Sequence, residues 1–336
     1  MFIVPQHTYR PLPELLLGPR GLQFQFWRHP AATTSSREAV ILLSGFGIHP
    51  RAFSLRAHCD WIAHWQGAGM DVFTIDLLPL AGDCTLAEQA RALHDWCTSL
   101  RTAAGYTTLH AVGFSLGGLQ WLAALAQQRP LNLIHGENQS FLSTLALVEA
   151  PVDLSGYPIS TPARMTLRGL QIFGFSRIPY RWLNPILALL APLLQKTASW
   201  QKWANFNNLQ QIPLAEIITQ TFDNVPIGVA RQLLRWIDGH EPSYQPAALA
   251  DLPVLLVYGA NPYSARAQVL ADELARAFPA GSAQPPQLTL LPCQRAAACR
   301  ADYGHADLLL GDELRRDVLP AIQAWQLANR GRNRTS

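Results

Sequence analysis

The sequence predicts an α/β fold with a doubly wound, mostly parallel sheet and a helical lid insertion. Short continuous apolar runs alternate with segments of helical spacing along most of the 336 residues, a rhythm typical of sheets that are buried on both faces. The stretch 155–247 breaks this rhythm because it is rich in aromatic residues, proline and leucine and has no clear strand. We therefore expect a core formed by 1–154 and 248–330, a lid at 155–247 and a flexible tail at 331–336.

The elements of the core follow from two kinds of periodicity. Residues 22–28 (LQFQFWR) alternate apolar and polar side chains, which predicts a half-buried edge strand. Continuous apolar runs predict buried strands at 39–44, 71–76, 108–113, 143–148, 253–258 and 286–291. Helical spacing is found at 53–67, 85–103, 116–127, 264–277 and 312–328. Thr85 and Glu88 form a plausible capping box at the start of the second helix.

Composition and charge exclude several classes of protein. The net charge is only +3 and there is no long basic tract, so we expect no nucleic-acid partner. No apolar run reaches the roughly 18–20 residues that a membrane-spanning helix needs, although peripheral membrane contact stays open. The five cysteines are odd in number and scattered, and the N-terminus does not resemble a secretory signal, so we expect a cytoplasmic protein. The oligomeric state stays open.

The strongest chemical signal is Gly113-Phe114-Ser115-Leu116-Gly117, followed by Gly118. An apolar run precedes this G-x-S-x-G pattern and a helical segment follows at once, which is the strand–turn–helix context that a nucleophilic serine requires. The glycines permit a sharp turn in which larger residues would clash with neighbouring elements. The serine would then stand at the start of a helix, where backbone amides favour negative charge.

The lid contains an apolar run, 186–194 (ILALLAPLL), that is interrupted by proline and too short to span a bilayer. An insertion between two core strands of such a sheet lies at the strand ends, where ligands bind. We therefore expect a lid with an apolar underside that contacts a hydrophobic substrate, rather than a helical insertion that only packs on the sheet.

These features together resemble the α/β-hydrolase superfamily, over about residues 20–330. The resemblance rests on the order of a strand, the turn Ser44–Gly47, the G-x-S-x-G elbow, the insertion, a further strand and a late histidine. The segment Tyr303–Gly311 is similar to the histidine motif of lipase, esterase and polyhydroxyalkanoate-synthase relatives. The elbow is specific to the superfamily, whereas the histidine motif narrows the choice only modestly.

The resemblance implies a role for four residues. Ser115 would be the nucleophile, and His305, between the last strand and the C-terminal helix, would be its general base. The backbone amides of Leu116 and Phe46 would form the oxyanion hole. His49, near the Ser44–Gly47 turn, is a weaker candidate for substrate contact.

The third member of the triad is not decided by the sequence. The superfamily usually carries an acid shortly after the strand 253–258, but this chain has Asn261 there. Asp153 is the candidate that we place first, and Glu149 in the same segment after the strand 143–148 is an alternative. Asn261 is another, because an amide can orient an imidazole without stabilising its charge. A histidine without a working partner is the last alternative.

The predicted activity is that of a serine hydrolase that cleaves an apolar carboxylic ester or thioester through an acyl-serine intermediate. The alternatives are an acyltransferase or polyester-synthase-like enzyme that uses the same serine, and a non-catalytic binding protein with the same fold. The sequence shows neither a His-Glu-x-x-His motif nor zinc-type cysteine spacing, so we expect no metal and no cofactor.

Overall fold

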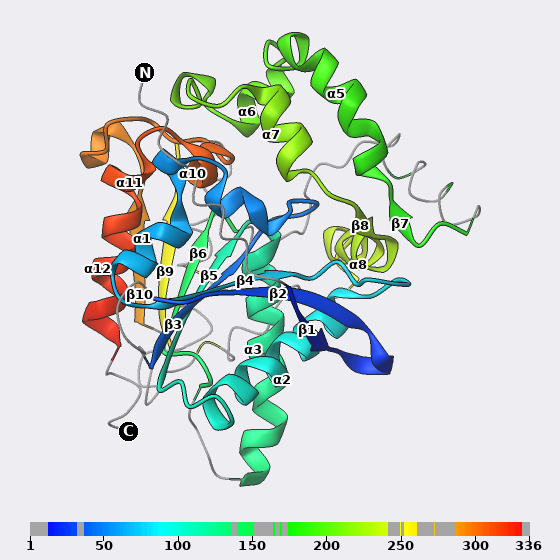
Figure 1. The fold of residues 1–336 in the computed structure, drawn as a ribbon, viewed down its shortest axis with the longest axis vertical. Helices are drawn as coiled ribbons and strands as arrows, with labels where there is room; N and C mark the ends of the chain where they lie inside the picture. Colours follow the sequence, from blue (N-terminus) through cyan, green and yellow to red (C-terminus); the bar gives the residue numbers. More distant parts are fainter. Residues whose placement is uncertain are drawn as a thin grey trace.

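The computed structural model describes residues 13–31, 37–135, 140–150, 174–240, 252–260 and 287–330, and the single positions 164, 169, 249 and 272. An eight-stranded sheet runs through the centre of the molecule in the order β1-β2-β4-β3-β5-β6-β9-β10 (Figure 1). Its strands are β1 (Glu14–Leu17), β2 (Gln23–His29), β3 (Glu38–Leu43), β4 (Asp71–Asp76), β5 (Thr108–Phe114), β6 (Thr144–Val148), β9 (Pro253–Tyr258) and β10 (Gln287–Pro292).

The pairing within the sheet is parallel from β4 through β10, and only β1–β2 and β2–β4 are antiparallel. The predicted doubly wound, mostly parallel sheet is thus confirmed. One strand was missed: β1 covers the side of β2, so β2 is not the edge strand that its alternation suggested. The β1 segment is only four residues long and buries Leu16 alone, while Leu15 and Leu17 are exposed, so its pattern is too short to recognise.

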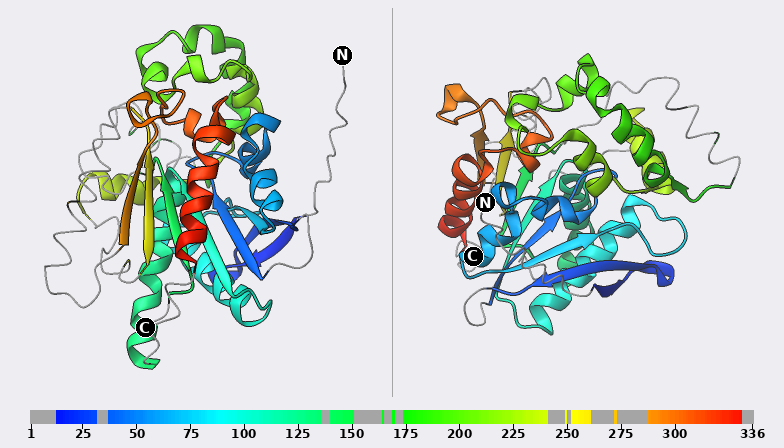
Figure 2. Two further views of the ribbon diagram at one scale, coloured as in Figure 1. Left: turned by 90° about the vertical axis from the view of Figure 1, so that its left-hand side faces the viewer. Right: turned by 45° about the horizontal axis from the view of Figure 1, so that its top comes forward.

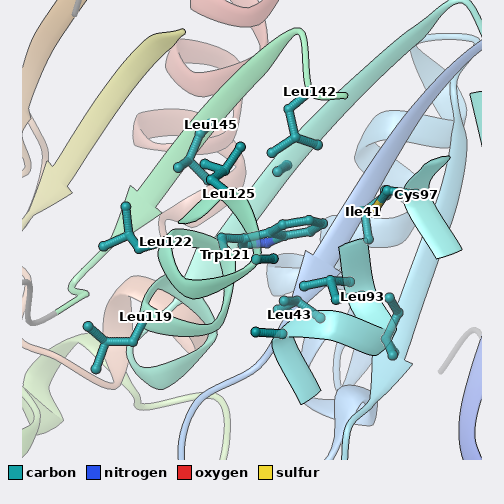
Figure 3. Close-up of a cluster of buried hydrophobic side chains, with 14 of the residues drawn as sticks. Ile41, Leu43, Leu93, Cys97, Leu119, Trp121, Leu122, Leu125, Leu142 and Leu145 are labelled. Atoms are coloured by element: carbon teal, nitrogen blue, oxygen red, sulfur yellow. The ribbon is translucent and has the colours of Figure 1, made fainter. Parts of the chain in front are cut away.

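Helices cover both faces of the sheet because each central strand is apolar on both sides. In β3, Ile41 and Leu43 face the cluster that contains α2 (Leu86–Thr102) and α3 (Leu116–His135). Trp121 of α3 lies in the middle of that cluster (Figure 3). Val40 and Leu42 face the opposite cluster, which contains α1 (Trp61–Gly67) and α12 (Leu319–Asn329). Alternate residues of one strand therefore support two separate cores.

Two predicted helices begin later than expected or are divided. The segment 53–67 contains the 3₁₀ turns Pro50–Ser54 and Ala57–Cys59 before α1, because the Asp60 carboxylate accepts a hydrogen bond from the Ala63 amide and starts a new helix. The segment 312–328 is divided into α11 (Leu314–Asp317) and α12, with Pro320 in the first turn of α12. The capping box of Thr85 and Glu88 is present as predicted. The helix expected at 264–277 lies outside the described residues, apart from position 272.

Residues 174–240 form a cap whose first three helices lie beyond the carboxyl ends of the central strands, while its last helix packs beside α2 (Figures 1 and 2). It is formed by α5 (Tyr180–Leu194), α6 (Ala198–Trp203), α7 (Leu214–Thr221) and α8 (Ile227–Ile237). The two-residue strands β7 (Arg177–Ile178) and β8 (Val225–Pro226) pair antiparallel within it, although the sequence showed no clear strand there. The limits predicted for the lid, 155 and 247, fall among residues outside the description.

The apolar run 186–194 of the cap faces a different direction from the one that we expected. Leu189 and Leu193 in α5 are 80% and 65% exposed, so these side chains do not form an underside over the sheet. Asn184 and Ala191 are the buried residues of the helix, and they lie on the side that packs against α7. The expected apolar underside is therefore not found at Leu189 and Leu193, and contact of this run with a substrate stays a prediction.

The first turn of α3 touches the strands backbone to backbone, and glycines make this approach feasible. A Cβ on Gly117 would lie 2.4 Å from the Leu43 carbonyl oxygen at the end of β3. A Cβ on Gly113 would lie 2.6 Å from Gly118, and one on Gly118 would lie 2.3 Å from the Ala150 Cβ. Because two of these neighbours are backbone, a side chain at Gly113 or Gly117 would push α3 away from the sheet.

We expect Gly117→Ala to lower the free energy of unfolding by about 3 kcal/mol, the upper end of the usual cost of overpacking, because main-chain atoms cannot turn aside. Thermal or urea unfolding measures this change. Gly67→Ala is the matched control, since a Cβ at Gly67, the last residue of α1, meets nothing within 4 Å. Equal stability of the two variants would contradict the proposed close approach.

Candidate active site

Ser115 occupies the turn between β5 and α3, in the geometry predicted for a nucleophile elbow. Its φ is +54°, a left-handed conformation that non-glycine residues seldom adopt, and its side chain is partly exposed. The Ser115 amide donates to the Val148 carbonyl at 2.9 Å, and the Gly118 amide donates back to the Ser115 carbonyl at 3.0 Å. The turn is therefore held from the strand side and the helix side, and strain of this kind is typical of functional sites.

The loop after β3 packs against this serine. A Cβ on Gly45 would lie 3.0 Å from the Ser115 Cβ, so the loop passes directly over the elbow. The Gly47 carbonyl accepts from the Asp223 amide at 2.7 Å, and the His49 amide donates to the Thr221 carbonyl at 2.6 Å. The cap thus fixes the conformation of the loop that carries Phe46.

The two amides predicted for the oxyanion hole have no partner among the described residues. Neither Phe46 nor Leu116 donates its N–H to another described group. Leu116 is the first residue of α3, where backbone amides point out of the helix, and Phe46 lies in the loop over the elbow. Both amides are available to donate hydrogen bonds to a negatively charged oxygen that forms next to Ser115.

Glu149 is the acidic residue that the structure brings to His305. One carboxylate oxygen of Glu149 lies 3.4 Å from His305 Nδ1, and the other accepts from the Gly259 amide at 2.6 Å. The Glu149 side chain is 2% exposed, and its backbone φ is +47°. With the ring proton on Nδ1 facing this carboxylate, Nε2 keeps its lone pair for a second proton.

The other candidates for the third position cannot be placed in the same way. Asp153, which we placed first, and Asn261 both lie outside the described residues. Asp302 and Asp307, close to the histidine in sequence, bind other groups: Asp302 accepts from the Arg295 amide at 2.8 Å. Within the part of the chain that the structure describes, Glu149 is therefore the carboxylate that contacts the ring.

His305 lies next to the elbow through the residue that precedes the serine. The Phe114 ring packs on the imidazole with centroids 4.9 Å apart. Among the described residues the Ser115 hydroxyl forms no hydrogen bond with His305. Catalytic hydrogen bonds are often long in the absence of substrate and form only in the bound complex.

Asp307 organises the segment around His305. This carboxylate is buried, and it accepts from the Gly304 amide at 2.9 Å, the Asn205 amide at 3.1 Å and the Asn208 side chain at 3.1 Å. Burial raises the pKa of Asp307 above its usual value, while these hydrogen bonds lower it. The contacts tie the histidine segment to the residues that follow α6, so the cap helps to position His305.

The other histidines are not placed for the same role. His110 lies inside β5, where its Nδ1 is 2.8 Å from Thr144 Oγ1, and burial lowers its pKa to about 4. The Arg51 amide donates a hydrogen bond to His49 Nδ1 at 3.0 Å. His49 lies near Asp76 and Asp223, with one side-chain atom of each within 4.8 Å of the others. This cluster was not foreseen from the sequence, and proximity alone does not make it a metal site.

A small pocket adjoins the elbow on the side of β4. Its lining includes Gly45, Leu116, Gln120, Asp76 and Asp223. Its volume of about 40 Å³ holds two or three water-sized groups. The sequence analysis missed Asp76 and Asp223. The position of Asp76 could have indicated it, because this residue ends a buried strand at the edge of the sheet where ligands bind. Asp223 comes from the cap, and its position gave no such indication.

The pKa of Asp76 is raised to about 7, mainly by burial and also by the nearby charge of Asp223, whereas Arg177 and Arg181 act to lower it. The Leu78 amide donates to Asp76 at 2.9 Å and favours the charged form. This carboxyl group therefore keeps its proton to a higher pH than an ordinary aspartate does. The pocket thus presents an acid that can donate or accept a hydrogen bond next to the predicted oxyanion hole.

Comparison with solved structures identifies the fold. A carboxyl esterase from Bacillus coagulans, solved with glycerol, is 14% identical with a TM-score of 0.61, over 95% of this chain and 98% of that one. A lipase in its open form is 15% identical with a TM-score of 0.61, over 96% and 99%. The chain has the α/β-hydrolase fold.

A third hydrolase-fold neighbour is a soluble variant of monoglyceride lipase from Saccharomyces cerevisiae with a substrate analogue. It is 17% identical with a TM-score of 0.54, over 97% of this chain and 98% of that one. No family model and no curated protein sequence matches the chain. Among the described residues of this α/β-hydrolase fold, the helices are too short or too polar to cross a membrane.

The role of Glu149 can be tested with Glu149→Gln. The amide oxygen can still accept from Gly259, but it carries no charge to stabilise the imidazolium, so we expect the rate of labelling by a fluorophosphonate probe to fall by about 10³- to 10⁴-fold. Asp153→Asn, four residues further along, is the matched control and should label at the normal rate. The assignment fails if Asp153→Asn is the slow variant and Glu149→Gln labels normally.

The raised pKa of Asp76 predicts a pH-dependent stability. Between about pH 4 and pH 7 the folded state holds a proton that the unfolded chain has lost, so the free energy of unfolding falls as pH rises through this window. Asp76→Asn removes this ionisation and should melt a few degrees (about 2–4 °C per kcal/mol) above the natural protein at pH 8 but not at pH 4. Thermal scans of both proteins measure the difference.

Glu14→Gln serves as the control for this experiment because Glu14 is an exposed residue at the start of β1. Its melting temperature should follow that of the natural protein at each pH. A constant difference between Asp76→Asn and the natural protein across the range would show that Asp76 does not titrate there.

Proposed function

We propose that the protein is a serine hydrolase that cleaves an apolar carboxylic ester or thioester through an acyl-serine intermediate. The observation that carries this proposal is the contact between Glu149 and His305 next to a serine in a left-handed elbow. Esterases and lipases among the solved structures that share the fold support the same class of reaction.

In the first half of the proposed reaction, Ser115 Oγ attacks the carbonyl carbon and His305 Nε2 takes the hydroxyl proton. The carbonyl double bond opens, and its electron pair becomes an oxyanion that the amides of Phe46 and Leu116 stabilise. The bond to the leaving group then breaks, and His305 returns the proton to the departing oxygen or sulfur. Glu149 stabilises the imidazolium formed between these two transfers.

In the second half, a water molecule attacks the acyl-serine while His305 removes one of its protons. The same two amides hold the second oxyanion, and its collapse breaks the bond to Ser115 Oγ. His305 then gives its proton back to the serine and the carboxylic acid leaves. Each proton that His305 accepts is thus returned within one half-reaction, so the enzyme ends each turnover unchanged.

An aromatic cluster next to the site supports an apolar substrate. Trp203 and Phe222 of the cap pack with centroids 6.1 Å apart, and Phe222 bridges to Ile48 in the loop over the elbow. The Trp203 carbonyl accepts from the Ala306 amide at 3.0 Å, next to His305. Backbone contacts of Phe222 and Trp203 thus hold two partly buried aromatic rings beside the two catalytic segments. An acyl chain that displaces water from these rings would gain free energy in proportion to the area buried.

The experiment that tests this proposal is hydrolysis of p-nitrophenyl esters of increasing chain length, together with fluorophosphonate labelling. We expect rates to rise from acetate to longer acyl chains and Ser115→Ala to abolish both hydrolysis and labelling without changing the melting temperature. Ser99→Ala, at an exposed serine of α2, is the matched control and should keep full activity. Labelling that survives in Ser115→Ala would contradict the assignment of the nucleophile.

Two other results would point to different functions. Ester products that form only when an alcohol or amine is supplied would identify an acyltransferase that uses the same serine. A natural protein that neither labels nor hydrolyses any ester of the series would be a binding protein with the hydrolase fold. A flat chain-length profile would contradict the apolar substrate while leaving the hydrolase intact.

A further inference from the structure

Helix α5 carries the largest exposed apolar surface among the described residues. Trp182, Ile186, Leu189 and Leu193 are between 58% and 80% exposed, and Leu183 and Leu190 beside them are 44% and 40% exposed. These six account for more than half of the eleven large hydrophobic side chains exposed in the described part of the chain. Their spacing of three, four and seven residues places them on one side of the helix. We call these six residues the α5 outer face.

The opposite side of α5 holds the helix on the protein. It packs against α7, and the Asn184 side chain donates to the Phe222 carbonyl at 2.9 Å. The Arg181 amide donates to the Asn224 side chain at 3.1 Å. Because both contacts lie on the inner side, the outer face is free of any structural task that the described residues show. Figures 1 and 2 show α5 at the outer edge of the cap, beyond the carboxyl ends of the strands.

The stretch of sequence that contains this helix carries charges of a single sign. Residues 154–215 contain no aspartate or glutamate, and they contain six cationic residues, Arg164, Arg168, Arg177, Arg181, Lys196 and Lys202. Since the whole chain has a net charge of +3, the remainder carries −3. The cap as a whole, residues 174–240, carries six cationic residues and three acidic ones, Glu216, Asp223 and Asp238, so its net charge is +3. This charge attracts the cap to a negatively charged surface.

The two lysines lie immediately beyond the outer face. Lys196 follows the end of α5 and Lys202 is in α6, and both are exposed and without an ion-pair partner among the described residues. They are the only lysines of the chain. Arg181, at the other end of the helix next to Trp182, is also exposed, and its Nε lies 4.0 Å from an Asp223 carboxylate oxygen. The apolar face is thus bordered by cations at both ends.

We propose that the α5 outer face docks on a lipid surface that contains anionic headgroups. The helix would lie parallel to the surface, with Trp182, Ile186, Leu189 and Leu193 entering the boundary between headgroups and acyl chains. Lys196 and Lys202 would lie at the level of the lipid phosphates, where each cation near the surface contributes favourably. The helix has 15 residues, two of them proline, so it lies on a bilayer rather than across it.

A second copy of the chain fits this face less well. Two caps, each with a net charge of +3, would face each other in a symmetric dimer, and the six residues of the α5 outer face include no carboxylate that could neutralise the lysines beside it. A lipid phosphate supplies the missing negative charge, and its acyl chains accept the apolar side chains. The direct connection from α5 through Phe222 to the loop over Ser115 would bring the proposed active site close to that surface.

The test is co-sedimentation of the full chain with vesicles of phosphatidylglycerol and phosphatidylcholine, compared with vesicles of phosphatidylcholine alone. We expect binding to the mixed vesicles, and a loss of at least about 100-fold in affinity for Leu189→Asp/Leu193→Asp because two inserted leucines are removed. Leu17→Asp is the matched control, since Leu17 is 69% exposed on the edge strand β1 rather than on α5, and it should bind like the natural protein.

A second variant tests the charges separately. Lys196→Gln/Lys202→Gln should weaken binding to the mixed vesicles by about 30-fold and leave the melting temperature unchanged. Equal loss of binding in Leu17→Asp, or unchanged binding in the Leu189→Asp/Leu193→Asp variant, would overturn the proposal. A natural protein that is dimeric by light scattering, and becomes monomeric in Leu189→Asp/Leu193→Asp without vesicle binding in either form, would assign the face to self-association instead.

The vesicle experiment is separable from the proposed hydrolase activity. Ser115→Ala should bind vesicles like the natural protein, because docking uses no catalytic group. A protein that binds vesicles but does not label with the fluorophosphonate probe would contradict the hydrolase and support the docking face. A protein that labels with the probe but does not bind vesicles would support the hydrolase and contradict the docking face.

Discussion

The contact between the first turn of α3 and the strand backbones is the constraint on which the rest of the site depends. Gly113, Gly117 and Gly118 leave no room for a Cβ, so the helix starts closer to the sheet than side chains would allow. The chain reaches that position only by turning through a left-handed residue, and Ser115 is that residue. The exposure of the hydroxyl and the alignment of the Leu116 amide are consequences of this one approach.

A second turn of the same hand supports the first. Glu149 follows β6 with a positive φ, and its carboxylate holds the Gly259 amide after β9 as well as facing His305. One buried side chain therefore joins the ends of two neighbouring strands to the histidine segment. The cost of placing this charge away from water is offset by the hydrogen bond that it accepts and by the ring that it faces.

Much of the fold could be predicted because its signals are local. Apolar runs defined the buried strands, and the glycines of the elbow specified both the turn and the serine. The sequence could not decide between Glu149 and Asp153 as the partner of His305, because the two lie four residues apart in one segment. The choice depends on a backbone turn that no neighbouring residue predicts. The direction of α5 was mistaken for a similar reason. Both of its sides are apolar, so periodicity could not tell which one packs against α7.

The distribution of lysine gives the cap a chemical identity that the core lacks. Apart from the terminal amine, Lys196 and Lys202 are the only primary amines of the chain, and both are exposed beside one helix. A reagent that acylates side-chain amines is therefore directed to the cap. Attachment of the protein to a solid support through such a linkage would present the helical cap to the support and the strands β1 and β2 to the solution, so a single orientation would be favoured without any engineered tag.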